Sequence, residues 1–160
     1  MKEHAVPSPC FVLELAKLRG NLDRIRDVRE RTGAEILVAL KAFALSPGLR
    51  EIANVADGAT VSSLSEAIHA SGVFGHSMHA YAPVYLENEF GRIAELCRHV
   101  TFNTPSQYGR FRDRGEGCSP GLRLNPGYSD VETDLYNPCA PGSRLGSMPG
   151  TLPPGIEGLH

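Results

Sequence analysis

A lysine directly follows an apolar run that is typical of a buried strand. Residues 36–40 are all apolar, which predicts a strand buried on both faces, and Lys41 comes next. An ammonium group in that position is costly unless something compensates it. A desolvated lysine loses its proton readily and can form a Schiff base with a carbonyl group, so one interpretation is that Lys41 carries pyridoxal phosphate. The alternative is a strand-end lysine whose ammonium group reaches water.

Strand-like and helix-like segments alternate along the rest of the chain. Apolar runs predict strands at residues 36–40, 59–62, 78–82, 99–103, 121–125 and 156–160. Amphipathic periodicity, capping residues and glycines predict helices at about residues 15–32, 46–55, 63–75, 86–97 and 104–114. This alternation implies right-handed βαβ units and a parallel sheet.

A parallel sheet of this kind closes in one of two ways. No GxGxxG motif follows the first strand, which weakens a doubly wound dinucleotide-binding fold. In a (β/α)8 barrel, catalytic groups stand at the carboxyl ends of the strands. Polar residues occupy those ends here, namely Lys41, Ser62 or Ser63, Asn103, and Arg123 or Asn125. The sequence therefore favours an α/β fold with a TIM-like barrel.

Only part of such a barrel fits in the chain. A complete barrel takes roughly 200 residues or more, whereas the sequence has 160 residues. We therefore expect residues 1–160 to be the front part of a larger protein. An unclosed barrel would leave strand edges unpaired.

Composition argues against several classes of protein. A net charge of −2 at pH 7 gives no footprint of nucleic-acid binding. No apolar run approaches the ~20 residues that span a bilayer, and no signal-peptide core follows the first residues. We therefore expect a cytoplasmic protein without a membrane or nucleic-acid partner. The dispersed cysteines and histidines have no metal-ligand spacing, so no metal site is expected.

Two motifs are more specific than these patterns. One is Lys-Ala-Phe-Ala, which starts at Lys41, and the other is Tyr-Asn-Pro-Cys-Ala-Pro-Gly-Ser-Arg-Leu-Gly, from Tyr136 to Gly146. Together they closely resemble the carboxynorspermidine (carboxyspermidine) decarboxylase family, which are pyridoxal-phosphate-dependent enzymes of the alanine racemase fold. Supporting segments fall in the family's order at residues 9–13, 62–67, 81–85, 122–126 and 156–160.

The resemblance covers essentially the whole chain and implies its place in a longer protein. It identifies residues 1–160 as the N-terminal part of a pyridoxal-phosphate-binding barrel of the alanine racemase type. Family members are roughly twice as long, because they finish the barrel and add a C-terminal β-domain. That missing portion carries the glycine-rich phosphate site, the acid that pairs with the pyridine nitrogen, and residues contributed across the dimer interface.

The resemblance assigns five residues to the cofactor. It implies that Lys41 is the Schiff-base lysine and that Arg123 is a strand-end arginine beside the cofactor. Ser63 and Glu66 match a segment near the cofactor in the wider superfamily, although a helix capping box explains them as well. His160 is the first of two family histidines at this strand, and the second is the better candidate for stacking on the pyridine ring.

Two residues of the long loop are candidates for binding the substrate. Arg144 could neutralise a substrate carboxylate or the cofactor phosphate, or it could bond loop carbonyls. Asp134 could meet a cationic polyamine nitrogen. Cys139 lies in the second motif, but we interpret it as structural, because the catalytic cysteine of relatives comes from the C-terminal domain.

The resemblance implies an activity for the full-length enzyme. This is a carboxy-lyase that uses pyridoxal phosphate to convert carboxynorspermidine or carboxyspermidine to norspermidine or spermidine in polyamine biosynthesis, as a homodimer. The sequence does not choose between the two substrates. The alternatives are a same-fold decarboxylase of diaminopimelate or ornithine, a non-catalytic barrel protein that binds pyridoxal phosphate, and an inactive fragment. We expect weak or absent activity from these 160 residues alone.

Overall fold

The computed structural model describes residues 8–115, 117–150 and 152–160, and its centre is a sheet of six parallel strands. The strands lie side by side in the order in which they occur along the chain. They are β1 Leu37–Ala39, β2 Gly58–Val61, β3 Met78–Tyr81, β4 His99–Phe102, β5 Ser119–Leu122 and β6 Gly158–Leu159.

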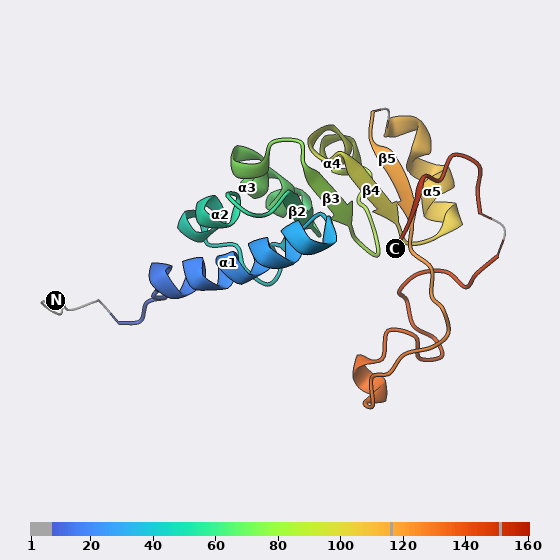
Figure 1. The fold of residues 1–160 in the computed structure, drawn as a ribbon. Helices are drawn as coiled ribbons and strands as arrows, with labels where there is room; N and C mark the ends of the chain where they lie inside the picture. Colours follow the sequence, from blue (N-terminus) through green and yellow to red (C-terminus); the bar gives the residue numbers. More distant parts are fainter. Residues whose placement is uncertain (1–7, 116, 151) are drawn as a thin grey trace, which may run out of the picture.

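The helices form one layer because the strand order never reverses. The helical segments are α1 Leu15–Thr32, α2 Ser46–Ile52, α3 Leu64–Phe74, α4 Phe90–Leu96, α5 Pro105–Phe111, and the 3-10 turns η1 Arg112–Arg114 and η2 Asp134–Tyr136. Each right-handed crossover between neighbouring strands places its helix on the same face, and Figure 1 shows α2 to α5 in a row along the sheet. A doubly wound fold would reverse the order. The prediction of an α/β fold with a partial (β/α)8 barrel is therefore confirmed.

The two faces of the sheet carry different side chains. Successive residues of a strand point to opposite faces, and on the outer face, under the helices, the apolar side chains are buried. They are Ala59, Val61, Met78, Ala80, Val100, Phe102 and Leu122. The inner face is polar. On it, the paired residues His79 and His99 have ring centroids 4.2 Å apart. Burial, and then the charge of His99, lower the pKa of His79, so the neutral form of its ring is favoured.

An aromatic cluster fixes the helices to the outer face. Phe102 is 1% exposed, and its ring lies 6.0 Å from that of Tyr85, 5.8 Å from Phe90 and 5.4 Å from Tyr108. The buried Tyr85 hydroxyl donates to the carbonyl of Thr101 at 2.9 Å, so it is not left without a partner. This cluster joins β4 to α4 and α5.

Two capping boxes fix the turns that follow β2 and β4. The Ser63 hydroxyl accepts from the Glu66 N–H at 3.2 Å, and the Glu66 carboxylate accepts from the Ser62 N–H at 2.7 Å. In the same way, the Thr104 hydroxyl accepts from the Gln107 N–H at 3.1 Å. The predicted helix starts at Ser63 and Thr104 are therefore confirmed, and both turns are held at the carboxyl edge of the sheet.

The first strand differs from its prediction. β1 is shorter than residues 36–40, and Leu37, Val38 and Ala39 are half-buried. The reason is its place at the edge of the described sheet, where β2 is its strand neighbour. The prediction of a strand buried on both faces is wrong for the part of the chain that is described. The fifth strand also begins earlier than predicted, because the Ser119 N–H already bonds the Arg98 carbonyl at 2.8 Å.

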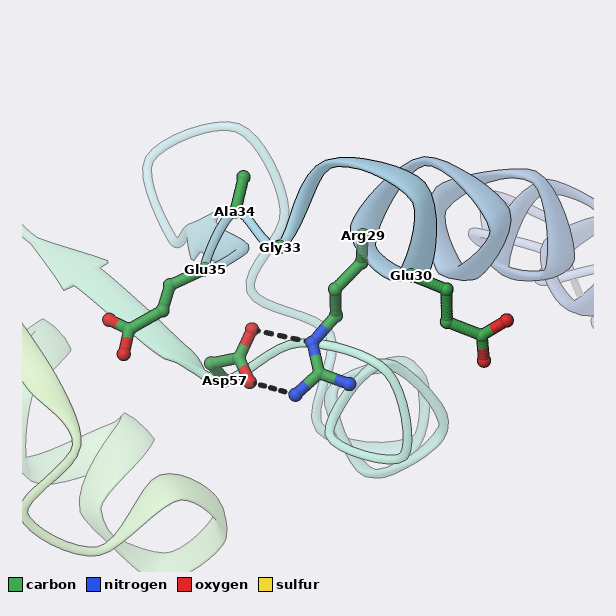
Figure 2. A pocket seen from close by; sticks show the side chains of 6 residues that line it. All are labelled: Arg29, Glu30, Gly33, Ala34, Glu35 and Asp57. Atoms are coloured by element: carbon green, nitrogen blue, oxygen red, sulfur yellow. Dashed lines mark hydrogen bonds and ion pairs between the residues drawn. The ribbon is translucent and has the colours of Figure 1, made fainter.

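A charged pair fastens the end of α1 to the amino edge of the sheet. Arg29 donates two hydrogen bonds to Asp57, which precedes β2, and the Asp57 carboxylate also accepts from the Ile36 N–H at 2.8 Å. The pair lines a hollow of about 360 Å³. Figure 2 shows Arg29 and Asp57 facing each other, with Glu30 and Glu35 on either side of them. Because Asp57 already engages the arginine, we interpret this hollow as a structural joint. None of the helices in the described ranges is long and apolar enough to cross a membrane.

Replacing Phe102 tests the importance of the aromatic cluster. We expect Phe102→Ala to lower the free energy of unfolding by about 3–5 kcal/mol, the usual range for removing a fully buried aromatic ring. Phe102→Leu keeps more of the volume and should lower it clearly less. Urea unfolding followed by circular dichroism measures both, and equal losses for the two variants would contradict the packing described.

The Asp57 joint predicts a pH dependence. The hydrogen bonds from Arg29 and then from Ile36 hold the pKa of Asp57 below its ordinary value of 3.8. Its stabilising effect is therefore present above the unfolded-state pKa and is lost as pH falls through the folded-state pKa. We expect Asp57→Asn to unfold at lower urea concentration than the wild type at pH 7, and the difference to shrink as the pH approaches 3. A difference that is constant with pH would contradict this.

Candidate functional site

The carboxyl edge of the sheet holds a polar cavity of about 370 Å³. Its lining side chains come from β1, β2 and β3 and from the residues that follow β1, β2, β5 and β6. They are Ala39, Lys41, Thr60, Ser62, Tyr81, Arg123 and His160. The strand alternation explains this set, because all seven occupy inner-face positions. The cavity is therefore the place where the inner face meets the carboxyl edge.

Lys41 lies at the rim of this cavity. It stands in a tight turn after β1, in which the N–H groups of Ala42 and Phe43 bond the Ala39 carbonyl at 3.0 and 3.2 Å. Lys41 itself is exposed. One interpretation of the sequence predicted a desolvated lysine, but Lys41 is exposed in the described structure. It stands in the turn after β1, and β1 itself is only half-buried. Its place beside the inner face is shown by the cavity that it lines together with Ala39 and Tyr81.

Lys41 is distinct from the other lysines of the chain. The sequence has three, and Lys2 lies outside the described residues. Lys17 lies on α1 and pairs with Glu14 at 2.7 Å, with its side chain 75% exposed. Of the two lysines that are described, Lys41 is the one that lines a cavity.

Tyr81 contacts two of the three other charged or titratable residues of the cavity, His160 and Arg123. Its ring centroid lies 4.9 Å from that of His160, and the Arg123 guanidinium carbon lies 4.8 Å from the centre of the Tyr81 ring. Burial, and then the charges of Arg123 and Lys41, lower the pKa of His160. The neutral imidazole is therefore favoured in this group, which leaves Lys41 and Arg123 as the cationic side chains of the lining.

The Tyr136–Gly146 loop motif is anchored to this edge by a buried asparagine. Asn103 is 6% exposed, and its side-chain oxygen accepts from the Tyr81 hydroxyl at 2.9 Å and from the Gly146 N–H at 2.7 Å. Its side-chain nitrogen donates to the Arg144 carbonyl at 2.8 Å. One amide group therefore joins β3 to the end of the loop.

A second asparagine, three residues beyond the end of β5, anchors the same loop. Asn125 is 8% exposed, and its backbone N–H donates to the Ser147 carbonyl at 2.7 Å. Its side-chain nitrogen lies 3.4 Å from the Leu145 carbonyl. Gly146 lies between these contacts with a φ of +77°, and a Cβ there would come within 3.1 Å of the Arg123 side chain. The end of the loop motif therefore packs closely against the Arg123 side chain at Gly146.

The structure gathers some of the predicted site residues and not others. Lys41, Arg123 and His160 share the cavity. Ser63 and Glu66 form the cap of α3 and do not line it. Among the loop residues, Arg144 and Asp134 are exposed and outside the lining, and Cys139 is half-buried. The Arg144 contact with Asn103 is made by its backbone carbonyl.

Tyr81 is the lining residue that sequence reasoning passed over. It lies inside the predicted strand 78–82, where an alternating pattern would place it on the same face as His79. Extending this alternation to the end of the strand would have predicted that Tyr81 lies on the inner face at the carboxyl edge. Thr60 and Ser62 follow the same rule on β2. Ser62 was one of the strand-end residues named from the sequence, whereas Thr60, inside its strand, was not.

Comparison with known proteins relates this geometry to enzymes. No family model matches the chain. It is 43% identical to carboxyaminopropylagmatine decarboxylase of Synechocystis sp. and 37% identical to carboxynorspermidine/carboxyspermidine decarboxylase of Campylobacter jejuni, each over 97% of this chain and 42% of the relative. The crystal structure of the Campylobacter jejuni carboxynorspermidine decarboxylase complexed with norspermidine superimposes with a TM-score of 0.83 at 33% identity, over 97% of this chain and 41% of that one.

The chain is homologous to part of the carboxynorspermidine/carboxyspermidine decarboxylases. The resemblance seen in the sequence motifs is thus confirmed, and the similarity extends to the fold. The chain spans about two fifths of the length of the homologous decarboxylases. Their activity belongs to those longer chains.

Gly146 offers a test of how the loop meets the cavity. A non-glycine residue at φ +77° is strained, and its Cβ would also press on Arg123. We expect Gly146→Ala to lower the free energy of unfolding by about 1–3 kcal/mol. Gly142→Ala is the matched control, since Gly142 has a φ of +80° in the same loop but open space around its Cβ position. Urea unfolding of both variants measures the difference, and a smaller loss for Gly146→Ala would contradict the close contact.

Proposed function

We propose that this chain is the cofactor-holding part of a pyridoxal-phosphate-dependent decarboxylase, with Lys41 as the residue that binds the cofactor covalently. The observation that carries the proposal is the cavity at the carboxyl edge. It brings Lys41 together with Tyr81, Arg123 and His160, in a chain homologous to decarboxylases. In barrels of this kind, the carboxyl edge is where catalytic groups act.

The side chains of the cavity fit pyridoxal phosphate. The cavity of about 370 Å³ lies in the range of small-molecule sites. Lys41 supplies a primary amine for the aldehyde, and Tyr81 and His160 supply neighbouring aromatic rings. Arg123 supplies a cation for the phosphate or for a substrate carboxylate. When bound, pyridoxal phosphate provides an electron sink for the charge left behind by a departing carboxylate.

The residues of the chain prepare this site before any ligand arrives. Lys41 stands at the rim, where an incoming amine can reach it. Tyr81 holds Arg123 against its ring face, so the guanidinium is oriented without a carboxylate partner in the lining. His160 is favoured in its neutral form, so it adds ring surface next to Tyr81 without a third positive charge.

The proposed substrate is carboxynorspermidine or carboxyspermidine, and the products are norspermidine or spermidine. The support is the name of the Campylobacter jejuni relative and the norspermidine complex of the similar structure. A second candidate is carboxyaminopropylagmatine, because a decarboxylase of that name is 43% identical. These substrates share a carboxylate and cationic nitrogens. Arg144 and Asp134, both exposed on the loop, are the proposed partners of those charges.

The setting of the enzyme is part of the same proposal. We place it in the cytoplasm, as a homodimer of the full-length chain, in polyamine biosynthesis. Residues 1–160 form the N-terminal part of its cofactor-binding barrel. The remaining cofactor contacts come from outside these residues. Sedimentation analysis of the full-length protein measures the oligomeric state.

Chemical trapping tests the role of Lys41. We expect borohydride reduction of the full-length protein with pyridoxal phosphate to fix the cofactor on Lys41, read by peptide mass spectrometry. Lys17 serves as an internal control. Lys41→Ala should lose the label and slow the release of CO2 from carboxynorspermidine at least about tenfold, because the amine that attaches the cofactor is removed. Labelling at Lys17, or an unchanged rate in Lys41→Ala, would overturn the assignment.

The same protein distinguishes the alternatives. A decarboxylase of diaminopimelate or ornithine would label at Lys41 but turn over those substrates faster than carboxynorspermidine, carboxyspermidine or carboxyaminopropylagmatine. A non-catalytic carrier would label at Lys41 and release no CO2 from any of them.

A further inference from the structure

We infer that Asn103 is a positioning residue that couples the Tyr136–Gly146 loop motif to Tyr81, and through Tyr81 to the cavity at Lys41. The inference rests on the proposed function for its effect on catalysis. The coupling itself rests on contacts within the chain. Neither Asn103 nor its loop contacts follow from the decarboxylase assignment.

The first step is the saturation of one buried amide. The Asn103 oxygen accepts two hydrogen bonds, from the Tyr81 hydroxyl at 2.9 Å and the Gly146 N–H at 2.7 Å. The nitrogen donates to the Arg144 carbonyl at 2.8 Å. Because the side chain is almost fully buried, water cannot replace these partners at low cost. The positions of the loop and of the Tyr81 hydroxyl are therefore set by the same group.

The second step is the fixed orientation of Asn103 itself. Its backbone N–H donates to the Gln107 side chain at 2.6 Å, within the turn that opens α5. Its backbone carbonyl accepts from the Ser147 hydroxyl at 3.3 Å. The residue is thus held by the sheet edge and by α5, and it presents its amide to the loop in one direction.

The third step leads from Tyr81 to the cavity. The hydroxyl of Tyr81 is bound at one end of the ring, while the ring itself contacts His160 and Arg123. A shift of the hydroxyl turns the ring under both of these groups. Gly146 also lies against the Arg123 side chain, so the loop reaches the same arginine by a second route. Displacement of the loop therefore changes the positions of Tyr81 and Arg123 in the cavity, although no side chain of the loop enters the cavity.

Four variants of the full-length protein separate the parts of this coupling. Asn103→Leu removes all three side-chain hydrogen bonds. Asn103→Asp keeps the two acceptor bonds and removes the donor to the Arg144 carbonyl. Tyr81→Phe removes the hydroxyl and keeps the ring. Ser147→Ala is the matched control, since it removes one bond to the Asn103 backbone and leaves the amide intact.

The first measurement needs neither cofactor nor substrate. Trypsin cleavage after Arg144, followed by mass spectrometry, reports how often the loop detaches. We expect Asn103→Leu to raise the cleavage rate about tenfold or more, as the loss of buried hydrogen bonds would produce. Asn103→Asp should also raise it, because a carboxylate oxygen would then face the Arg144 carbonyl, whereas Ser147→Ala and Tyr81→Phe should each raise it less than about threefold. Equal cleavage in Asn103→Leu and the wild type would overturn the coupling, whether or not the protein binds pyridoxal phosphate.

The second measurement links the loop to the chemistry. With carboxynorspermidine as substrate, we expect Tyr81→Phe and Asn103→Leu each to lower kcat about tenfold or more, and the double variant to lower it no further than Asn103→Leu alone. A purely structural role would lower stability and leave kcat per folded enzyme unchanged, and multiplicative effects of the two substitutions would show independent roles. Either outcome overturns the inference. A wild type that is not labelled at Lys41 by pyridoxal phosphate and borohydride overturns the proposed function instead.

Discussion

The two-residue repeat of a parallel strand is the constraint on which this structure depends. In β2 to β4 it separates an apolar set that packs under the helices from a largely polar set that faces inward. Because the strand order never reverses, all the inward sets share one surface. The cavity is the carboxyl end of that surface, so its residues come from positions 39 to 160 of the chain without any special loop to collect them. On the outer face, the aromatic cluster around Phe102 packs α4 and α5 against β4.

Much of this arrangement could be predicted from local sequence signals. The capping boxes at Ser63 and Thr104 and the glycine that stops α1 involve residues close together in the chain, and they fixed the element order. Lys41, Arg123 and His160 could be named because they stand at or beside strand ends and match family motifs. Those signals involve residues close together in the sequence, so they can be recognised without knowledge of the tertiary structure.

The features that the sequence analysis predicted wrongly or missed depend on contacts between residues far apart in the sequence. The burial of β1 was overestimated, because the number of strands that flank it is not encoded in residues 36–40. Asn103 was recognised as a strand-end residue, but its contacts with Arg144 and Gly146 span more than forty positions of sequence. Tyr81 was missed for the same reason, since its importance lies in a ring that contacts His160, which follows β6, and Arg123, which follows β5.

The position of the His79–His99 pair on the inner face has a consequence for the charge that a ligand meets. His79 and His99 lie nearer the amino ends of their strands than Lys41 and Arg123, which follow strand ends, and the lowered pKa of His79 favours the uncharged form of its ring. Lys41 at the rim and Arg123 against the Tyr81 ring are the cationic side chains of the cavity, and none of its described lining residues is a carboxylate. Positive charge is therefore concentrated at the carboxyl edge of the inner face. A zwitterionic molecule will therefore be oriented as it approaches. Its anionic end will face the carboxyl edge, and its ammonium groups will face the solvent.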